Sequence, residues 1–268
     1  KYVPVLDDGT LDQDAYRKML SPRVKLVAFT HVSNVLGTVN PAKEMTAAAH
    51  EAGAVVLVDA AQSVPHMAVN VMDLDCDFLA FSGHKMCAPT GIGALYGRES
   101  ILNEMDPYMT GGEMISKVTL EGATWAELPH KFEAGTPNIA GSIGLGTAVD
   151  YLTGLGMDRI LKYEHELTAY AVEVLGRIKG LRIFGRALER GGAVSFEVEG
   201  IHPHDLAQFT DQEGIAIRAG HMCAQPLMRK LGVPAVSRAS FYFYNLKEEI
   251  DRLAAAIEKA KGYFHHGT

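Results

Sequence analysis

The sequence predicts an α/β fold with a mainly parallel sheet in a large domain, followed by a smaller α+β domain. Short, nearly continuous apolar segments come early in the chain, as in strands buried on both faces of a parallel sheet. Later segments alternate apolar and polar residues, as strands of a half-covered sheet do. We place the boundary near Leu152, which gives domains at residues 1–151 and 152–268.

Three apolar segments predict strands of the large domain: VKLVAFT (24–30), AVVLVDA (54–60) and DFLAFSG (77–83). Asp12 is expected to cap an earlier helix. Between the first two strands, a second helix should have Asn40 as its cap and Pro41 at its first position, and it should end before Gly53. Strand, helix and strand at this spacing form a βαβ unit, which requires parallel strands. A further strand is predicted at GIGALYG (91–97).

The second half of the chain has a different pattern. Two helices interrupted near Gly154 and Gly156 should precede three alternating strands, which are AVSFEV (193–198), IAIRA (215–219) and ASFYFY (239–244). The last helix should open with a capping box formed by Asn245 and Glu248. Before these elements, the polar stretch TLEGATWAELP (119–129) predicts a mobile loop.

Composition narrows the classes of partner and compartment. The net charge of −7 argues against nucleic acid or an anionic membrane as the main partner. Three cysteines, Cys76, Cys87 and Cys223, form a poor disulfide framework, which favours a reducing compartment such as the cytoplasm. The densest histidine group, His202 and His204, lacks a second ligand cluster at zinc-like spacing. We therefore expect no metal site, and we expect these histidines to cap a helix.

Polar residues follow two neighbouring predicted strands. Asp59 ends the apolar strand VVLVD, where open α/β sheets bind ligands, although a turn residue is the simpler alternative. Lys85 follows the next strand, and burial there would favour the neutral amine that attacks an aldehyde; the alternative is a surface lysine. Ser82 and His84 could donate to a phosphate. A lysine that traps an aldehyde and a carboxylate that pairs with a ring nitrogen together suit pyridoxal 5'-phosphate (PLP). Gln62 could donate to the ring hydroxyl of this cofactor.

Cys223 lies in a glycine-containing segment, AIRAGHMCAQP, after a predicted strand. Arg218 and His221 are close in sequence, and positive charges favour the reactive thiolate. Such a thiolate could accept a sulfur atom from an activated substrate, whereas the alternative is a small buried hydrophobic residue. Cys76 lies in a polar turn and Cys87 should pack near the lysine loop, so neither has a comparable setting.

Six segments resemble, in this order, the group II (SufS-like) cysteine desulfurases of the class V aminotransferase superfamily: FTHVSNVLGT, VLVDAAQSVPH, DFLAFSGHKMCAPTGIG, FEAGTPN, RAGHMCAQP and SRASFYFYN. The resemblance covers nearly the whole chain and implies the PLP-dependent transferase fold type I. It implies an enzyme that removes sulfur from L-cysteine, giving L-alanine and a persulfide on Cys223. A sulfur acceptor protein of the SufE or SufU type would collect this sulfur for iron–sulfur cluster assembly.

The resemblance also implies roles for matching residues around the cofactor. Lys85 would hold PLP covalently and act as general base and acid on the substrate. Asp59 would pair with the pyridine nitrogen and Gln62 with the ring oxygen. Thr136 would reach the phosphate of the other subunit's cofactor, so we expect a homodimer. The cofactor's own phosphate would be held by Ser82 and His84.

Other matching residues would act on the substrate. Arg238 would bind the substrate carboxylate, for which a planar guanidinium is suited, with Arg218 close by. Asn34 would lie near both that carboxylate and the ring hydroxyl. Cys223 would be the nucleophile, with His221 beside it as a further catalytic residue.

Two departures from the family pattern leave alternatives open. Many relatives carry two histidines where this chain has His221 and Met222, and methionine cannot move protons. The chain begins with Lys1 rather than Met, so we expect a preceding segment, with a ring-stacking histidine and a phosphate-binding turn, to be missing. One alternative is a selenocysteine lyase, acting on L-selenocysteine, or another class V PLP enzyme. The other is a truncated, cofactor-free scaffold.

Overall fold

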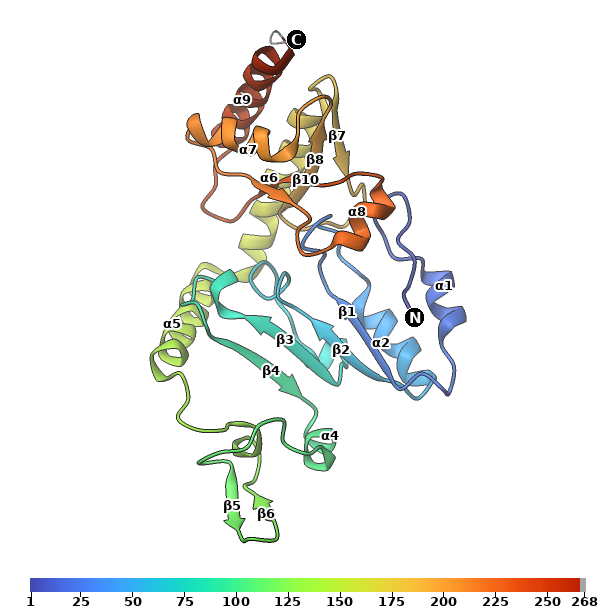
Figure 1. Cartoon of the computed structure of the whole chain (residues 1–268), viewed down its shortest axis with the longest axis vertical. Helices are drawn as coiled ribbons and strands as arrows, with labels where there is room; N and C mark the ends of the chain where they lie inside the picture. Colours follow the sequence, from blue (N-terminus) through green and yellow to red (C-terminus); the bar gives the residue numbers. More distant parts are fainter. Residues whose placement is uncertain (266–268) are drawn as a thin grey trace.

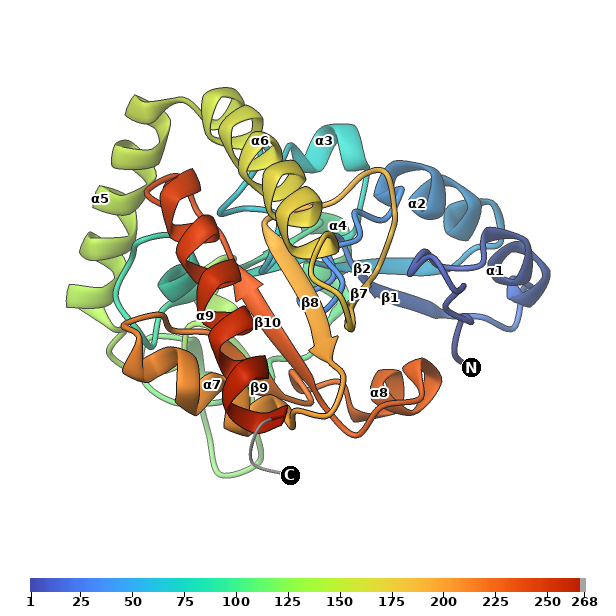
Figure 2. The same ribbon diagram turned by 90° about the horizontal axis from the view of Figure 1, so that it is seen from above.

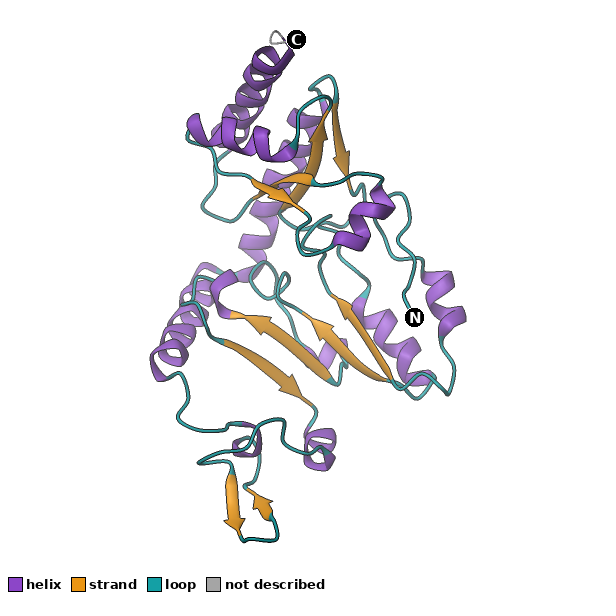
Figure 3. Cartoon of the chain, in the orientation of Figure 1, coloured by secondary structure: helices purple, strands orange, loops and turns teal. Residues whose placement is uncertain are grey.

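The computed structural model describes residues 1–265, which form two main sheets with helices packed around them (Figures 1 and 3). The first sheet has the order β1-β2-β3-β4, with strands β1 (Leu26–Thr30), β2 (Val55–Asp59), β3 (Phe78–Ser82) and β4 (Gly93–Gly97). The first three strands are parallel and β4 is antiparallel to β3. The predicted α/β class and the mainly parallel sheet are therefore confirmed.

The first half of the chain has four helices among the described residues, and the sequence predicts the first two. They are α1 (Gln13–Met19), α2 (Ala42–Glu51), α3 (Val71–Leu74) and α4 (Glu99–Glu104). Asp12 caps α1 by accepting the backbone N–H of Ala15 at 2.9 Å. The predicted cap of α2 is wrong, because Pro41 takes that position. Asn40 instead donates to the carbonyl of Thr30 at 2.7 Å and ties the loop back to β1.

A small hairpin replaces the loop predicted at residues 119–129. Strands β5 (Ile115–Val118) and β6 (Ala123–Trp125) pair in antiparallel fashion and project from the rest of the chain (Figure 1). The turn that joins them is closed by Thr119, whose N–H donates to Gly122 O at 2.8 Å. The prediction failed because the polar, exposed sequence lacks the apolar alternation of a strand, while backbone pairing alone suffices for a short hairpin.

The second sheet has the order β7-β8-β10-β9, with strands β7 (Leu181–Phe184), β8 (Ala193–Val198), β9 (Arg218–Gly220) and β10 (Val236–Ser240). Only 193–198 was predicted with its observed bounds. The strand predicted at 215–219 begins later, at Arg218. The strand predicted at 239–244 is wrong beyond Ser240, because Tyr242 N–H donates to Asn245 Oδ1 at 2.9 Å and closes a turn.

Helices of the second half are α5 (Ile139–Leu155), α6 (Met157–Gly176), α7 (Pro203–Gln212), α8 (Gln225–Leu231) and α9 (Lys247–His265), with two 3-10 turns earlier in the chain, η1 (Gly83–Lys85) and η2 (His130–Phe132). His202 caps α7, as expected. Glu249, rather than the predicted Glu248, closes the first turn of α9, because its carboxylate accepts Leu246 N–H at 3.0 Å. None of the helices within residues 1–265 combines the length and apolar character needed to cross a bilayer.

Separate apolar cores hold the helices on the sheets. Helices α6 and α9 lie across the second sheet (Figure 2), with Leu167, Phe196 and Ile257 fully buried between them. Another core packs α2 against β2. A smaller core lies between the two sheets, and its buried members are Met86, Leu152, Ile160 and Tyr242. Burial of a large apolar side chain contributes roughly 1.5–3 kcal/mol, so this junction resists separation of the two sheets.

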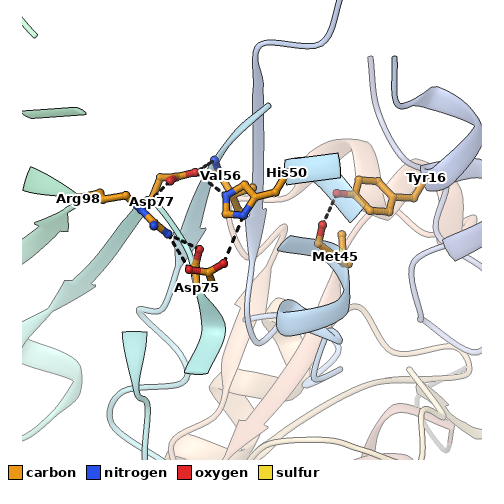
Figure 4. A network of polar contacts seen from close by, with 7 residues as sticks. All are labelled: Tyr16, Met45, His50, Val56, Asp75, Asp77 and Arg98. Carbon is orange, nitrogen blue, oxygen red and sulfur yellow. Dashed lines mark hydrogen bonds and ion pairs between the residues drawn. The ribbon is translucent and has the colours of Figure 1, made fainter. Parts of the chain in front are cut away.

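A network of polar contacts connects the strand ends of the first sheet that lie opposite Asp59 (Figure 4). Asp77 is the centre of this network: its carboxylate accepts the Val56 N–H at 2.7 Å and lies 2.9 Å from His50 Nε2. Arg98 Nε is 3.0 Å from the second oxygen of Asp77. The exposed Asp75 contacts Arg98 as well, and this contact lowers the pKa of Asp75.

Replacing Asp77 with alanine is expected to lower the free energy of unfolding by about 3 kcal/mol, measured by urea titration. The substitution leaves the Val56 N–H, His50 and Arg98 without the carboxylate that they contact. Asp75→Ala is the matched control and should cost clearly less, because this side chain is 66% exposed. Equal losses for the two variants would show that Asp77 does not organise the network.

Candidate active site

The polar residues predicted after the first-sheet strands lie at one edge of that sheet. Asp59 is the last residue of β2, and its register partners are Thr30 on β1 and Ala80 on β3. Ser82 ends β3 and is followed directly by the 3-10 turn that carries Lys85. Because the three strands are parallel, their carboxyl ends share this edge, where ligands bind in open α/β sheets.

The loop that carries Lys85 is held tightly by its backbone. Gly83 N–H donates to Ile92 O at 2.8 Å, and a Cβ at this glycine would lie 2.9 Å from the Ile92 side chain. Ser82 Oγ and His84 Nδ1 are 2.8 Å apart and lie beside each other on the exposed side of the loop. Lys85 is half-buried, and its amine forms no ion pair with any residue between 1 and 265. No salt bridge among these residues therefore holds the amine.

Asp59 itself is exposed and lightly held. Its Oδ1 accepts the N–H of Ala61 at 2.9 Å, which leaves the other carboxylate oxygen without a hydrogen bond among the described residues. Gln62 lies in the same turn and is half-buried. Both side chains thus lie on the turn that follows β2, beside the Lys85 loop.

Cys223 lies on a strained, exposed turn. Met222 and Cys223 have φ angles of 53° and 58°, a left-handed conformation that costs a non-glycine residue about 1–2 kcal/mol. Ala224 N–H donates to His221 O at 2.9 Å and closes the turn. Met222 is buried in an apolar cluster with Val35 and anchors the turn, while Cys223 and His221 stay exposed. Met222 stands where many relatives carry a histidine, and its apolar burial, which the residue pattern did not reveal, fixes the turn.

Asn34 connects the Cys223 turn to the second sheet. Its side-chain Nδ2 donates to the carbonyl of Met222 at 2.8 Å. Its own carbonyl accepts a hydrogen bond from Arg238 Nη1 at 2.7 Å. Asn34, in the loop that follows β1, therefore holds both the cysteine turn and the predicted carboxylate-binding arginine.

Arg238 and Arg218 form a cationic pair. They are register partners on the antiparallel strands β10 and β9. Burial, with a further contribution from Arg218, lowers the pKa of Arg238. Neither guanidinium forms a salt bridge within the part of the chain that is described. Like charges on opposed positions repel, so a carboxylate bound between them would be stabilised.

Thr136 is exposed on the segment before α5. The nearby Asn138 donates to Gly91 O at 3.2 Å, which is the link between this segment and the Lys85 loop. Residues 1–265 contain no group of three or more side chains that could hold a metal ion. Two hollows of about 690 and 620 Å³ lie elsewhere, against α6 and against the outer side of β1.

The three cysteines should differ in reactivity. Cys76 lies in the turn between α3 and β3, where the sequence placed it, but its side chain is fully buried, and burial raises the pKa of its thiol. Cys87 and Cys223 are exposed. Iodoacetamide is expected to modify these two in the folded protein and Cys76 only after unfolding in urea, as read by peptide mass spectrometry. Modification of Cys76 at the same rate as the others would contradict this burial.

Comparison with known proteins places this arrangement in a family. Residues 1–253 match the family described as Aminotransferase class-V. The chain belongs to this family. It is 55% identical over 265 residues to a probable cysteine desulfurase of Halalkalibacterium halodurans, covering 99% of this chain and 65% of the relative. It is 51% identical to the cysteine desulfurase of Haloferax volcanii, covering 98% and 62%.

Solved structures of this class V aminotransferase family agree with the fold. The apo cysteine desulfurase from Thermococcus onnurineus superposes with a TM-score of 0.93 at 42% identity, covering 97% of this chain and 65% of that one. A variant of C-DES with glycine covalently linked to its PLP cofactor gives a TM-score of 0.79 at 25% identity, covering 91% and 63%. This chain therefore spans somewhat less than two thirds of the length of its relatives.

Proposed function

We propose that this class V aminotransferase family member acts as a PLP-dependent cysteine desulfurase. The observation that carries the proposal is the position of Asn34, which places the Cys223 turn and Arg238 beyond the sheet edge that carries Lys85 and Asp59. At the sheet edge lie Lys85 and Asp59, and Asn34, directly beyond the same edge, holds both the Cys223 turn and Arg238. The names of the relatives at 51–55% identity support the same activity.

The residues of the sheet edge fit PLP. The free amine of Lys85 suits its aldehyde, the exposed carboxylate of Asp59 suits its pyridine nitrogen, and the paired donors Ser82 and His84 suit its phosphate. Gln62 would contact the ring hydroxyl. Bound PLP supplies an electron sink for bonds broken at the substrate.

The second group of residues would bind the substrate and accept its sulfur. Arg238 and Arg218 would hold the carboxylate of L-cysteine, while the Asn34 side chain keeps the Cys223 turn in place. The Cys223 thiolate would attack the substrate sulfur: an S–S bond forms, the carbon–sulfur bond breaks, and the carbon product leaves as L-alanine after protonation. Lys85 would move protons at the substrate carbon, and the exposed His221 would assist at the sulfur.

We further propose the assembly and cellular setting that follow from this activity. Thr136, exposed before α5, would contact the cofactor phosphate of a second copy, so the active form would be a homodimer. A SufE- or SufU-type protein would collect the persulfide sulfur for iron–sulfur cluster assembly in the cytoplasm. The chain would divide into domains at residues 1–151 and 152–268.

The test uses the chain alone and a chimera that adds the part of the H. halodurans relative that lies outside the match. Each protein is incubated with PLP, reduced with borohydride and analysed by intact and peptide mass spectrometry. We expect one reduced cofactor on the peptide that contains Lys85, and alanine from cysteine in at least the chimera. Faster turnover of selenocysteine would favour the lyase, and a protein that never binds PLP would favour a scaffold.

A further inference from the structure

A cluster of three side chains outside the candidate active site lies at the junction of the two sheets. His66 Nδ1 is 2.8 Å from Glu164 Oε2, and the Glu164 side chain is only 2% exposed. The Tyr242 ring meets the His66 ring edge-on, with centroids 4.8 Å apart. The Tyr242 hydroxyl donates to the carbonyl of Pro65 at 2.9 Å. We call His66, Glu164 and Tyr242 the junction cluster.

Each member of the junction cluster comes from a different part of the fold. His66 lies in the turn after β2, the same turn that begins with Asp59 and contains Gln62. Glu164 lies on α6, which extends from beside the first sheet to the second (Figure 1). Tyr242 is the second residue after β10, the strand that carries Arg238. The cluster therefore ties the cofactor side of the site to the substrate side.

The Lys85 loop contacts the same cluster. Met86 packs with Tyr242 in the apolar core between the sheets. Burial raises the pKa of Tyr242, with further contributions from Cys87 and Glu164. The hydroxyl therefore stays protonated and can keep donating to Pro65. Through these contacts one tyrosine touches both loops that bear the predicted cofactor ligands.

The energetics of the junction cluster favour a geometric role. Burial raises the pKa of Glu164 against the opposing effect of His66, which means that desolvation of the carboxylate outweighs its attraction to the imidazole. Glu164 Oε1 also lacks a hydrogen-bond partner among the described residues. A buried polar pair of this kind adds little net stability, but its hydrogen bond defines one arrangement of the groups around it.

We propose that His66, Glu164 and Tyr242 are positioning residues that hold the Asp59 turn and the Lys85 loop in register with Arg238. The proposal rests on the function proposed above, because it assigns these segments to cofactor and substrate. Loosening the junction cluster would leave each half folded, since each has its own core, but would let the two sets of ligands move apart. The effect should be local mobility and weaker substrate binding rather than general unfolding.

The first test measures backbone amide hydrogen exchange in the chain itself, without cofactor. Glu164→Gln and Tyr242→Phe keep the side-chain shapes, and their matched controls are Glu166→Gln and Tyr244→Phe, which alter exposed neighbours. Exchange in residues 60–67 and 83–92 should rise about tenfold in the two junction variants and stay unchanged in the controls. Strands β7 and β8 should exchange as in the parent chain.

The second test measures steady-state kinetics of the same four variants in the chimera with L-cysteine. The junction variants should raise KM about fivefold or more at unchanged PLP content, while the controls stay within twofold. Any one of three results would overturn the positioning role. These are unchanged exchange in both loops, an equal rise in exchange across both sheets, and faster exchange without a change in KM. If the parent chimera makes no alanine, the proposed function fails, and the exchange test alone decides whether the junction cluster holds the loops.

Discussion

Replacement of Cys223 with serine is expected to reduce alanine formation from L-cysteine by about three orders of magnitude or more. A serine hydroxyl is nearly isosteric but is a far weaker nucleophile toward sulfur than a thiolate, so no persulfide should form. Cys223 is exposed in a left-handed turn that Asn34 holds in place, which suits the attack proposed above. Alanine release in the chimera and persulfide labelling on the Cys223 peptide are the measurements.

Cys87→Ser is the matched control, because Cys87 is also exposed and has a φ angle of 65°. This variant should retain activity within a few-fold, and both variants should keep the cofactor adduct on Lys85. A Cys223→Ser protein that releases sulfide at the parent rate would show that another group accepts the sulfur.

Replacement of Lys85 with alanine is expected to abolish both the borohydride-stable PLP adduct and the activity. Only a free amine at this edge can hold the aldehyde covalently, and the same amine would move the proton at the substrate carbon. Activity should fall by about three orders of magnitude or more. Peptide mass spectrometry after reduction, together with the visible absorbance of the protein, gives the result.

Lys43→Ala serves as the control, because Lys43 is an exposed lysine on α2. It should leave the adduct and the activity unchanged. If Lys85→Ala gave an adduct of equal yield on another lysine, Lys85 would not be the residue that holds the cofactor. The proposal that Lys85 and Asp59 contact the same cofactor would then fail.

The local sequence was a good guide where an element depends on its own periodicity. The apolar segments at 24–30, 54–60 and 77–83 each contain an observed strand, and Asp12 caps its helix as predicted. Side-chain periodicity and capping act over a few residues, so they can be recognised without the rest of the chain. The parallel βαβ order then placed Asp59 and the Lys85 loop at one edge.

Predictions failed where distant residues compete for the same groups. Asn40 bonds Thr30 instead of capping α2, and the aromatic residues 241–244 leave the strand to form a turn at the junction of the sheets. Their high strand propensity is overridden by packing between the sheets. The hairpin at residues 115–125 escaped notice because its pairing leaves no apolar pattern.

The sequence alone therefore determined the class of fold, the strands of the first sheet and the chemical types gathered at its edge. Only the tertiary structure decided how the second half meets that edge. The bond from Asn34 to Met222 joins residues 188 positions apart, and the contact between His66 and Glu164 spans 98. Such contacts follow from the packing of whole elements, and no local spacing encodes them.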